Sequence, residues 1–178
     1  MRVIAGEFRS RRLKTLPGMA LRPTPDRLRE ALFNILSPRI ADCVFVDAYA
    51  GSGAVGIEAL SRGAARAIFI ERHPAAVRVI HENLAALGIE DRAHVIQAPA
   101  AMLLARYTDG IVFLDPPYPL AKEYDAALSA LGAAPLPSLV VIAQHHSKQM
   151  MVESQGALRR TRQVRQGDNT LSFYAPDR

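Results

Sequence analysis

The sequence is poor in cysteine and has no long hydrophobic run. Its single cysteine, Cys43, cannot form a disulfide within the chain, which fits a reducing compartment, so we expect a cytoplasmic protein. No apolar stretch approaches the roughly 18 residues that a membrane span needs, and we expect no membrane partner. The N-terminal segment "MRVIAGEFRSRRLKTL" is basic, but it lacks the apolar stretch and small-residue cleavage site of a secretion signal.

Metal-binding patterns are also missing. The histidines show no spacing typical of a metal site, so we expect no metal and interpret them as surface or hydrogen-bonded residues: His73, His81, His94, His145 and His146.

Positive charge is concentrated in two places. The net charge is +5, and residues 1–30 alone hold eight basic and three acidic side chains, which accounts for the whole excess. A second cluster without acids consists of Arg159, Arg160, Arg162 and Arg165. Localised positive charge is what a polyanion such as a nucleic acid would require, although a solvated basic surface is the alternative.

The length of 178 residues suits a single domain spanning 1–178, with a basic arm or short hairpin at 1–20 and a core at 21–178. Apolar runs that predict strands lie near 43–48, 66–70, 93–97, 110–115 and 138–144. Helical patterns lie near 54–62, 74–87, 99–107 and 121–132. Apolar strands separated by helices predict a parallel sheet covered on both faces, and residues 157–165 and 170–175 predict a closing antiparallel hairpin. We therefore expect an α/β, Rossmann-like, doubly wound and mostly parallel sheet of seven strands.

Residues that favour helix ends indicate where the predicted helices begin and stop. Thr24 is a suitable N-cap and Pro25 suits the first helical position, so a helix is expected to begin there and to stop at Pro38. Gly63 and Gly88 fall where helix C-caps are expected.

A glycine-rich turn follows the first predicted strand. In "VFVDAYAGSGAVGIEAL", Gly51, Gly53 and Gly56 match the spacing G-x-G-x-x-G, and Glu71 ends the next strand about 20 residues further on. In such a unit the glycines let the backbone approach a ligand, and the acid binds ribose hydroxyls. The pattern predicts a nucleotide or nucleoside site; the alternative is a tight turn followed by a surface glutamate.

Asp47 narrows the choice of nucleoside. It ends the first strand just before the loop, where a carboxylate would repel a pyrophosphate and attract an ammonium group. S-adenosylmethionine carries an ammonium, a sulfonium and a ribose diol, which suit Asp47 and Glu71. A dinucleotide-dependent dehydrogenase is a weaker alternative, because little chain is left outside the sheet to hold its substrate.

The segment "FLDPPYP" ends the fourth predicted strand. Pro116 and Pro117 stop the strand because proline cannot donate to a sheet ladder. In a doubly wound sheet the ends of the first and fourth strands lie side by side, which places Asp115 near the glycine loop. There the Asp115 carboxylate and the Pro116 carbonyl can accept the two hydrogens of a planar amine, and Tyr118 offers a ring for a base to stack on. A turn that happens to carry an acid is the alternative.

These segments together resemble a known family. "DAYAGSGAVGIEALSRGA", "FIERHPAAVRVIHENL" and "DPPY" are similar to class I S-adenosylmethionine-dependent methyltransferases of base amines, and with "MRVIAGEFRSRRLKT" and "LRPTPDRLREALFNIL" the chain resembles the RsmD family. The resemblance implies methylation of the N2 amine of one guanine, of the guanine-966 type, in bacterial 16S ribosomal RNA of the small subunit.

The resemblance also implies residue roles. The donor would be held by Asp47, Tyr49, Ala50, Gly51, Ser52, Gly53, Glu71, Arg72, Gln97, Ala98, Ala100 and Asp115. The guanine would be received by Asp115, Pro116, Pro117 and Tyr118. RNA would be bound by Arg9, Arg11, Arg12, Lys14, Arg22, Thr24 and Arg27. The chain departs from the family after the third strand, where Pro99 cannot supply a polar contact to adenine, so that contact is expected from Gln97 or from the backbone at Ala100.

Two other functions stay open. A DNA adenine-N6 methyltransferase can use the same Asp-Pro-Pro-Tyr segment, but such enzymes usually carry a large target-recognition region for which this chain has no room. A nucleic-acid-binding module with a non-catalytic pocket is the other, and the intact glycine loop and Asp115 argue against it. We expect a monomer, because nothing in the sequence demands more.

Overall fold

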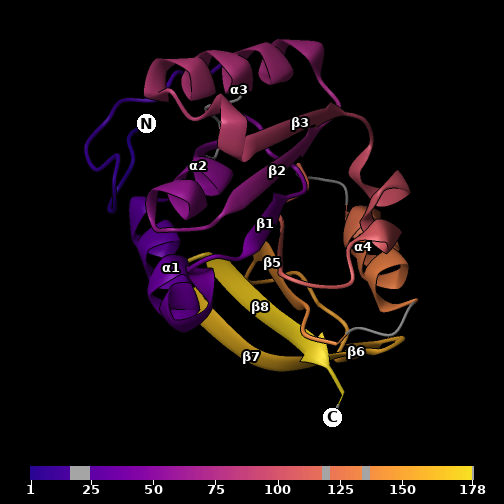
Figure 1. Cartoon of the computed structure of the whole chain (residues 1–178). Helices are drawn as coiled ribbons and strands as arrows, with labels where there is room; N and C mark the ends of the chain where they lie inside the picture. The colour runs from indigo at the N-terminus through magenta and orange to yellow at the C-terminus, as the bar shows by residue number, and fades with distance from the viewer. Residues whose placement is uncertain (17–24, 118–120, 134–136, 178) are drawn as a thin grey trace.

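The computed structural model describes residues 1–16, 25–117, 121–133 and 137–177 (Figure 1). In chain order its helices and strands are α1 (Asp26–Ile40), β1 (Val44–Asp47), α2 (Ala54–Ser61), β2 (Arg66–Glu71), α3 (Pro74–Leu87), η2 (Glu90–Arg92), β3 (Ala93–Gln97), η3 (Ala100–Met102), η4 (Leu104–Arg106), β4 (Ile111–Leu114), α4 (Ala121–Gly132), β5 (Val140–His146), β6 (Ser154–Gln155), β7 (Leu158–Gln166) and β8 (Asn169–Pro176).

The strands form one sheet in the order β3-β2-β1-β4-β5-β8-β7-β6. The first five run parallel, whereas β8, β7 and β6 are added as antiparallel neighbours. The predicted doubly wound sheet with a C-terminal hairpin is confirmed. The prediction of seven strands was wrong, because the two residues of β6 add an eighth strand that is too short to produce a hydrophobic pattern.

Helices cover both faces of the sheet, as Figure 1 shows. Successive strand residues point to opposite faces. Thus Phe45 packs with α1 and α2, while its neighbour Val46 packs with α4 on the other side. Val112 and Phe113 of β4 repeat this alternation. Burial on both faces explains why the central strands are continuously apolar.

Two predicted helix limits differ from the structure. α1 continues through Pro38 to Ile40, because proline's fixed φ is compatible with a helix and the buried Ile40 side chain anchors the last turn. Pro25 takes the N-cap position, and the predicted cap Thr24 lies outside the described residues. Gly88 caps α3 with a left-handed φ of 69°, and Gly63 follows the C-cap of α2 with a φ of 107°, so both glycines lie at helix ends as predicted.

The helix predicted over 99–107 is also different. It is two short 3-10 turns, η3 and η4, separated by Leu103. Leu103, with φ −112° and ψ −19°, joins the two turns: its N–H donates to the carbonyl of Ala100 at 2.9 Å, and its carbonyl accepts the N–H of Arg106 at 3.1 Å. The segment therefore keeps the short-range hydrogen bonds of 3-10 turns in place of those of an α-helix.

The basic arm, which we define as residues 1–16, forms the predicted short hairpin. An isolated antiparallel bridge joins Arg2 to Arg12, and the side chains of Val3, Phe8 and Leu13 are buried in the core between the arm, α2 and α3. The arm is therefore packed against the two helices that flank the glycine loop.

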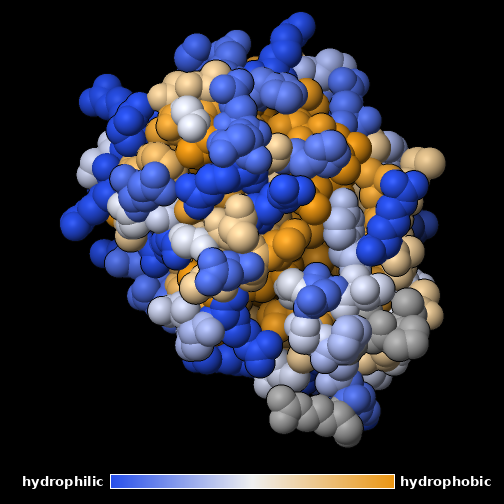
Figure 2. All heavy atoms as spheres, viewed as in Figure 1, coloured by the Kyte–Doolittle hydropathy of each residue, from blue (hydrophilic) through white to orange (hydrophobic). Residues whose placement is uncertain are grey.

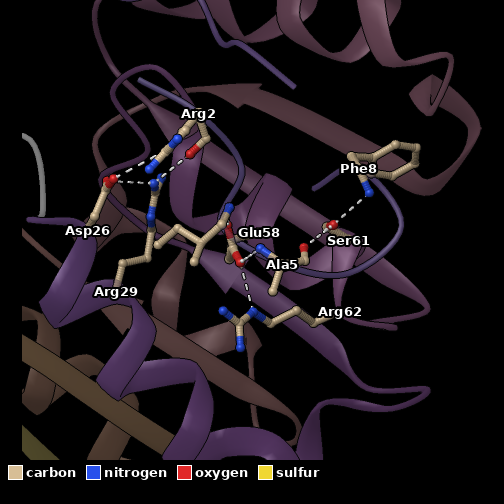
Figure 3. A network of polar contacts seen from close by, with 9 residues as sticks. Arg2, Ala5, Phe8, Asp26, Arg29, Glu58, Ser61 and Arg62 are labelled. Atoms are coloured by element: carbon tan, nitrogen blue, oxygen red, sulfur yellow. Dashed lines mark hydrogen bonds and ion pairs between the residues drawn. The ribbon is translucent and has the colours of Figure 1, made fainter. Parts of the chain in front are cut away.

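Buried polar groups of α2 hold the arm in place (Figure 3). Glu58, which is fully buried, accepts the backbone N–H groups of Ile4 and Ala5 at 2.8 and 3.0 Å. The Ser61 hydroxyl accepts the N–H of Phe8 at 2.9 Å and donates to the carbonyl of Ala5 at 2.6 Å. These hydrogen bonds satisfy arm backbone groups that would otherwise lack partners.

Arg29 of α1 fixes the other end of the hairpin (Figure 3). Its side chain is fully buried and donates from Nη2 to the carbonyl of Arg2 at 2.6 Å and to Asp26 at 3.1 Å. Burial lowers the pKa of Arg29, and the nearby carboxylates of Glu58 and Asp26 oppose that change.

The hydropathy of the surface varies across the face drawn in Figure 2. Hydrophobic residues gather in the middle of this face, and hydrophilic residues cover most of its upper left, where Figure 1 places the arm and α3. Among the described residues, no helix is both long and apolar enough to cross a bilayer.

Candidate active site

The glycine loop has the backbone conformation that its sequence predicts. Gly51 and Gly53 have positive φ values of 56° and 80°, which residues with a side chain rarely adopt. Gly56 lies in the first turn of α2, and a Cβ added there would lie 2.3 Å from Cε1 of Phe69 on β2. The loop therefore needs two glycines for its turn and a third for close packing of helix on strand, as in nucleotide-binding βαβ units.

Asp47 ends β1 beneath this loop. Asp47 is 2% exposed, and its Oδ2 accepts the N–H of Gly56 at 2.9 Å. Burial raises the pKa of Asp47 to about 7, an effect that the Gly56 hydrogen bond opposes and the Glu71 carboxylate increases. A buried carboxylate with a raised pKa is stabilised by a cation placed against it. Contact with a donor ammonium stays a prediction.

Glu71 ends β2 on the other side of the loop. Its Oε2 accepts the N–H of Gly51 at 2.9 Å and its Oε1 accepts the N–H of His73 at 2.8 Å. Each carboxylate oxygen has a second lone pair, so both can still accept a ribose hydroxyl. The structure therefore places Glu71 directly against the glycine loop.

The carboxyl end of β3 lies beside that of β2. Gln97 is paired with Glu71 in the β2–β3 register, and the N–H of Ala98 donates to the Glu71 carbonyl at 3.2 Å. Gln97 is exposed, whereas Ala100 is buried at the start of η3. Both groups that the sequence offers for adenine lie at this edge, and adenine recognition by either stays a prediction. Arg72 is exposed next to Glu71.

Asp115 directly follows β4, which pairs with β1 as predicted. Asp47 and Phe113 are register partners, and the N–H of Ala48 donates to the Phe113 carbonyl at 3.0 Å. Asp115 is half-buried, Pro116 is buried and Pro117 is exposed. The structure thus brings Asp115 to the edge where Asp47 and the glycine loop lie. Tyr118 lies outside the described residues.

Tyr49 connects the loop to α4. Its hydroxyl donates to Oε2 of Glu123 at 3.0 Å, and burial together with this carboxylate raises the pKa of Tyr49. Glu123 lies in the first turn of the helix that follows the Asp-Pro-Pro-Tyr segment. Sequence reasoning placed Tyr49 at the donor and missed this contact, because no local pattern links residues so far apart in the chain.

The predicted RNA-binding residues differ in what their side chains contact. Arg9 and Arg12 are exposed, and their side chains make no ion pair within the part of the chain that the structure describes. Arg11 is exposed and donates to the carbonyl of Ala86 at 2.8 Å, while Lys14 pairs with Glu82 at 2.8 Å. Arg27 is exposed on α1. Arg22 and Thr24 lie outside the described residues.

Asn83 of α3 was missed by the sequence reasoning. It is 2% exposed and lies on the apolar side of α3 with Ala76, Val79, Ile80 and Leu84. A polar residue at helical spacing within a hydrophobic stripe is the signal that could have identified it, because such a residue needs buried hydrogen-bond partners.

Two cavities of about 500 and 520 Å³ lie away from the glycine loop. The first lies between α1 and the β7–β8 hairpin, the second lies by the amino end of β4, and both are lined by Arg39 and Val140. In open α/β sheets, ligands bind outside the carboxyl ends of the strands at the switch point. The candidate site is therefore defined by its converging side chains and backbone groups, which all lie at the carboxyl ends.

Comparison with other proteins agrees with this geometry. Residues 1–175 match the family model described as Conserved hypothetical protein 95. The chain belongs to this family. The putative rRNA methyltransferase YlbH of Bacillus subtilis (strain 168) is 34% identical over 181 residues, which cover 98% of each chain. The ribosomal RNA small subunit methyltransferase D of Escherichia coli (strain K12) is 45% identical over 120 residues, which cover 66% of this chain and 60% of that protein. The resemblance to the RsmD family is thereby confirmed.

Solved structures give the same result for the fold. The putative methyltransferase yhhF from Escherichia coli superposes with a TM-score of 0.85 at 31% identity, covering 100% of this chain and 98% of that one. An RNA methyltransferase from Salinibacter ruber in complex with S-adenosyl-L-homocysteine has a TM-score of 0.63 at 18% identity, covering 88% and 95% of the two chains, which shows likeness of fold alone. The family member described here has the Rossmann-like fold of class I methyltransferases.

Proposed function

We propose that this protein transfers a methyl group from S-adenosylmethionine to the exocyclic N2 amine of a guanine in 16S ribosomal RNA of the small subunit. The observation that carries the proposal is the position of Asp115, directly after β4 and beside the end of β1, from which the glycine loop begins. The curated relatives, which are named as ribosomal RNA methyltransferases, support the class of substrate.

The donor would lie along the carboxyl ends of β1, β2 and β3. Asp47 would face the ammonium and Glu71 the ribose, beside the backbone of Gly51 and Gly53. S-adenosylmethionine supplies an electrophilic methyl carbon bonded to a positive sulfonium. The buried carboxylate of Asp47 favours a cationic ligand for the electrostatic reason given above.

Asp115 and Pro116 would act on the acceptor. The lone pair of an exocyclic amine is delocalised into the base, so the amine is a weak nucleophile. Hydrogen bonds from its two N–H groups to the Asp115 carboxylate and the Pro116 carbonyl would orient the lone pair towards the methyl group. As the new N–C bond forms, the C–S bond breaks and its electron pair stays on sulfur, which gives neutral S-adenosylhomocysteine. Positive charge develops on the nitrogen, and the carboxylate would stabilise it until the extra proton is released to solvent. Pro117 and Tyr118 complete the segment that would receive the base.

The basic arm and the start of α1 would supply phosphate contacts. Arg9 and Arg12 of the arm and Arg27 of α1 are exposed, and the arm is packed against α2 and α3, which begin beside the glycine loop. Cationic side chains in this place would hold RNA near the site without reading its sequence.

The proposal is tested by transfer of labelled methyl from S-adenosylmethionine. Unmethylated small-subunit particles, naked 16S RNA and duplex DNA are offered in parallel, and the products are analysed as nucleosides. N2-methylguanosine in particles or RNA is the expected product, and the better acceptor identifies the natural substrate. N6-methyladenine in DNA would overturn the proposed substrate, and donor binding without transfer to any acceptor would indicate a binding module.

A further inference from the structure

Asn83 contacts two segments that the proposed function assigns to different ligands. Its Oδ1 accepts the N–H of Lys14 at 2.8 Å, and its Nδ2 donates to the carbonyl of Lys14 at 3.1 Å. The same Nδ2 donates to the carbonyl of Ser52 at 3.0 Å. One side chain on α3 therefore joins the basic arm to the glycine loop.

The contacts of Asn83 engage both of its N–H groups and its carbonyl oxygen in a buried setting. A primary amide has two N–H hydrogens and one carbonyl oxygen, and the three hydrogen bonds engage all of these groups. The side chain is 2% exposed, so water does not replace a lost bond without rearrangement. Only an amide of this length can serve both segments at once, because a carboxylate has no N–H and a hydroxyl has one donor.

The position of Ser52 gives this contact a consequence for the donor. Ser52 lies between Gly51 and Gly53, whose positive φ values shape the loop. Glycine backbones have no side chain to restrict them, so the loop depends on hydrogen bonds to its neighbours for a fixed conformation. Glu71 holds the loop at the N–H of Gly51, and Asn83 holds it at the carbonyl of Ser52.

The position of Lys14 gives the contact a consequence for RNA. Lys14 lies near the end of the described arm, after Arg9, Arg11 and Arg12. Its backbone is held by Asn83 at both the N–H and the carbonyl, while its side chain forms a separate, exposed ion pair with Glu82. Exposed ion pairs contribute little, so the backbone contacts are the stronger link between arm and α3.

We propose that Asn83 is a positioning residue for methyl transfer: it fixes the donor loop through Ser52 and, with the same amide, ties that loop to the basic arm through Lys14. This inference rests on the proposed function, because it assumes that the loop binds the donor and the arm binds RNA. A disturbance at either segment is transmitted to the other through one side chain.

Asn83→Asp and Glu82→Gln are the matched pair of variants that test the proposal. Asn83→Asp keeps the size of the side chain and can still accept the Lys14 N–H, but it presents a carboxylate to the Ser52 carbonyl at pH 8. Glu82→Gln removes the neighbouring ion pair and leaves the amide contacts intact. Asn83→Ala is the second loss variant, so that the result does not depend on a buried charge.

Three measurements on the full chain separate a positioning role from a purely structural one. The dissociation constant of S-adenosylhomocysteine should rise roughly tenfold in both Asn83 variants, as expected for losing a buried hydrogen bond, and stay unchanged in Glu82→Gln. The KM for S-adenosylmethionine should rise in parallel, while kcat at saturating donor is retained. Hydrogen exchange at the amides of residues 3–14 should accelerate in the Asn83 variants alone.

The outcomes distinguish this inference from the proposed function. A lower kcat with an unchanged donor KM would show fewer folded molecules and overturn the positioning role. Faster arm exchange with unchanged donor affinity would also overturn it, because the arm and loop would then be independent. If the wild-type chain itself bound neither S-adenosylhomocysteine nor S-adenosylmethionine, the proposed function would fail first.

Discussion

Gly56 donates its backbone N–H to Oδ2 of Asp47 across 2.9 Å. The residue that ends β1 thus also fixes the first turn of α2, and the loop between them is held at both ends. A carboxylate at this place is favoured by the positive end of the helix, although burial raises its pKa to about 7. The arrangement combines a structural contact with a negative charge that a cationic ligand can use.

The raised pKa of Asp47 makes stability depend on pH. The ordinary pKa is 3.8 and the folded value is about 7, so the folded chain binds more protons than the unfolded chain between these values. The contribution of Asp47 to the free energy of unfolding therefore falls as pH rises from about 4 to about 7. Asp47→Asn, which can keep the Gly56 contact without the charge, should flatten this dependence in urea titrations at pH 5 and pH 8. Equal slopes in the variant and the wild type would contradict the assignment, and Asp168→Asn, at an exposed carboxylate, is the control.

Gly56→Ala should destabilise the fold by overpacking. The added Cβ would lie 2.3 Å from Cε1 and 2.8 Å from Cζ of Phe69, whose ring is fully buried. Such insertions cost about 1–3 kcal/mol. Gly88→Ala is a useful control, because nothing lies within 4 Å of its Cβ and only its φ of 69° opposes a side chain, at about 1 kcal/mol. Urea unfolding should show the larger loss for Gly56→Ala and a partial recovery in the double variant with Phe69→Leu. No recovery would indicate that Phe69 is not the obstacle.

The glycine loop and the strand ends around it could be predicted from the sequence, because their signals are local. Glycines in a strand–turn–helix pattern specify the loop, and the two prolines after Asp115 place the end of β4 to within one residue, at Leu114. The neighbouring position of β1 and β4 follows from a general rule of doubly wound sheets.

The contacts that pack the arm against α2 and α3 could not be predicted in the same way. Its contacts join Ile4 to Glu58 and Lys14 to Asn83, pairs that are 54 and 69 residues apart. Each is made by a buried polar side chain, and the hydrophobic periodicity of the sequence does not specify which backbone group such a side chain will bind. The helix predicted over 99–107 also differs from the structure, because this segment forms two short 3-10 turns that meet at Leu103.

Asp115→Ala should remove a contact that the proposed mechanism uses mainly in the transition state. We expect binding of S-adenosylhomocysteine to stay largely intact and kcat to fall by on the order of 10²–10³-fold, as for other single stabilising groups. Single-turnover methyl transfer at saturating donor and RNA measures this directly. Asp109→Ala, at an exposed carboxylate before the amino end of β4, is the matched control. Normal turnover in Asp115→Ala would refute the assigned role.

Replacing Arg9, Arg11 and Arg12 together by serine should reduce the salt dependence of RNA binding. Each phosphate contact contributes roughly 0.7 to the slope of log K against log salt for single strands, so losing up to three contacts should lower the slope by about 2. Arg9 and Arg12 make no ion pair within the described residues, and Arg11 loses one exposed hydrogen bond, to the carbonyl of Ala86, so the triple replacement should cost the fold little stability.

The control for this arm variant removes the same number of positive charges from the side of the sheet where the strands begin. Arg39, Arg66 and Arg106 are exposed near the amino ends of the strands, away from the glycine loop. Their replacement by serine lowers the net charge equally, so any general electrostatic effect on RNA binding is the same in both variants. The arm variant should lose more of the slope and more affinity, with the donor dissociation constant unchanged. Equal slopes in the two triple variants would mean that the basic arm makes no specific phosphate contact and that RNA is held by the overall charge of the chain.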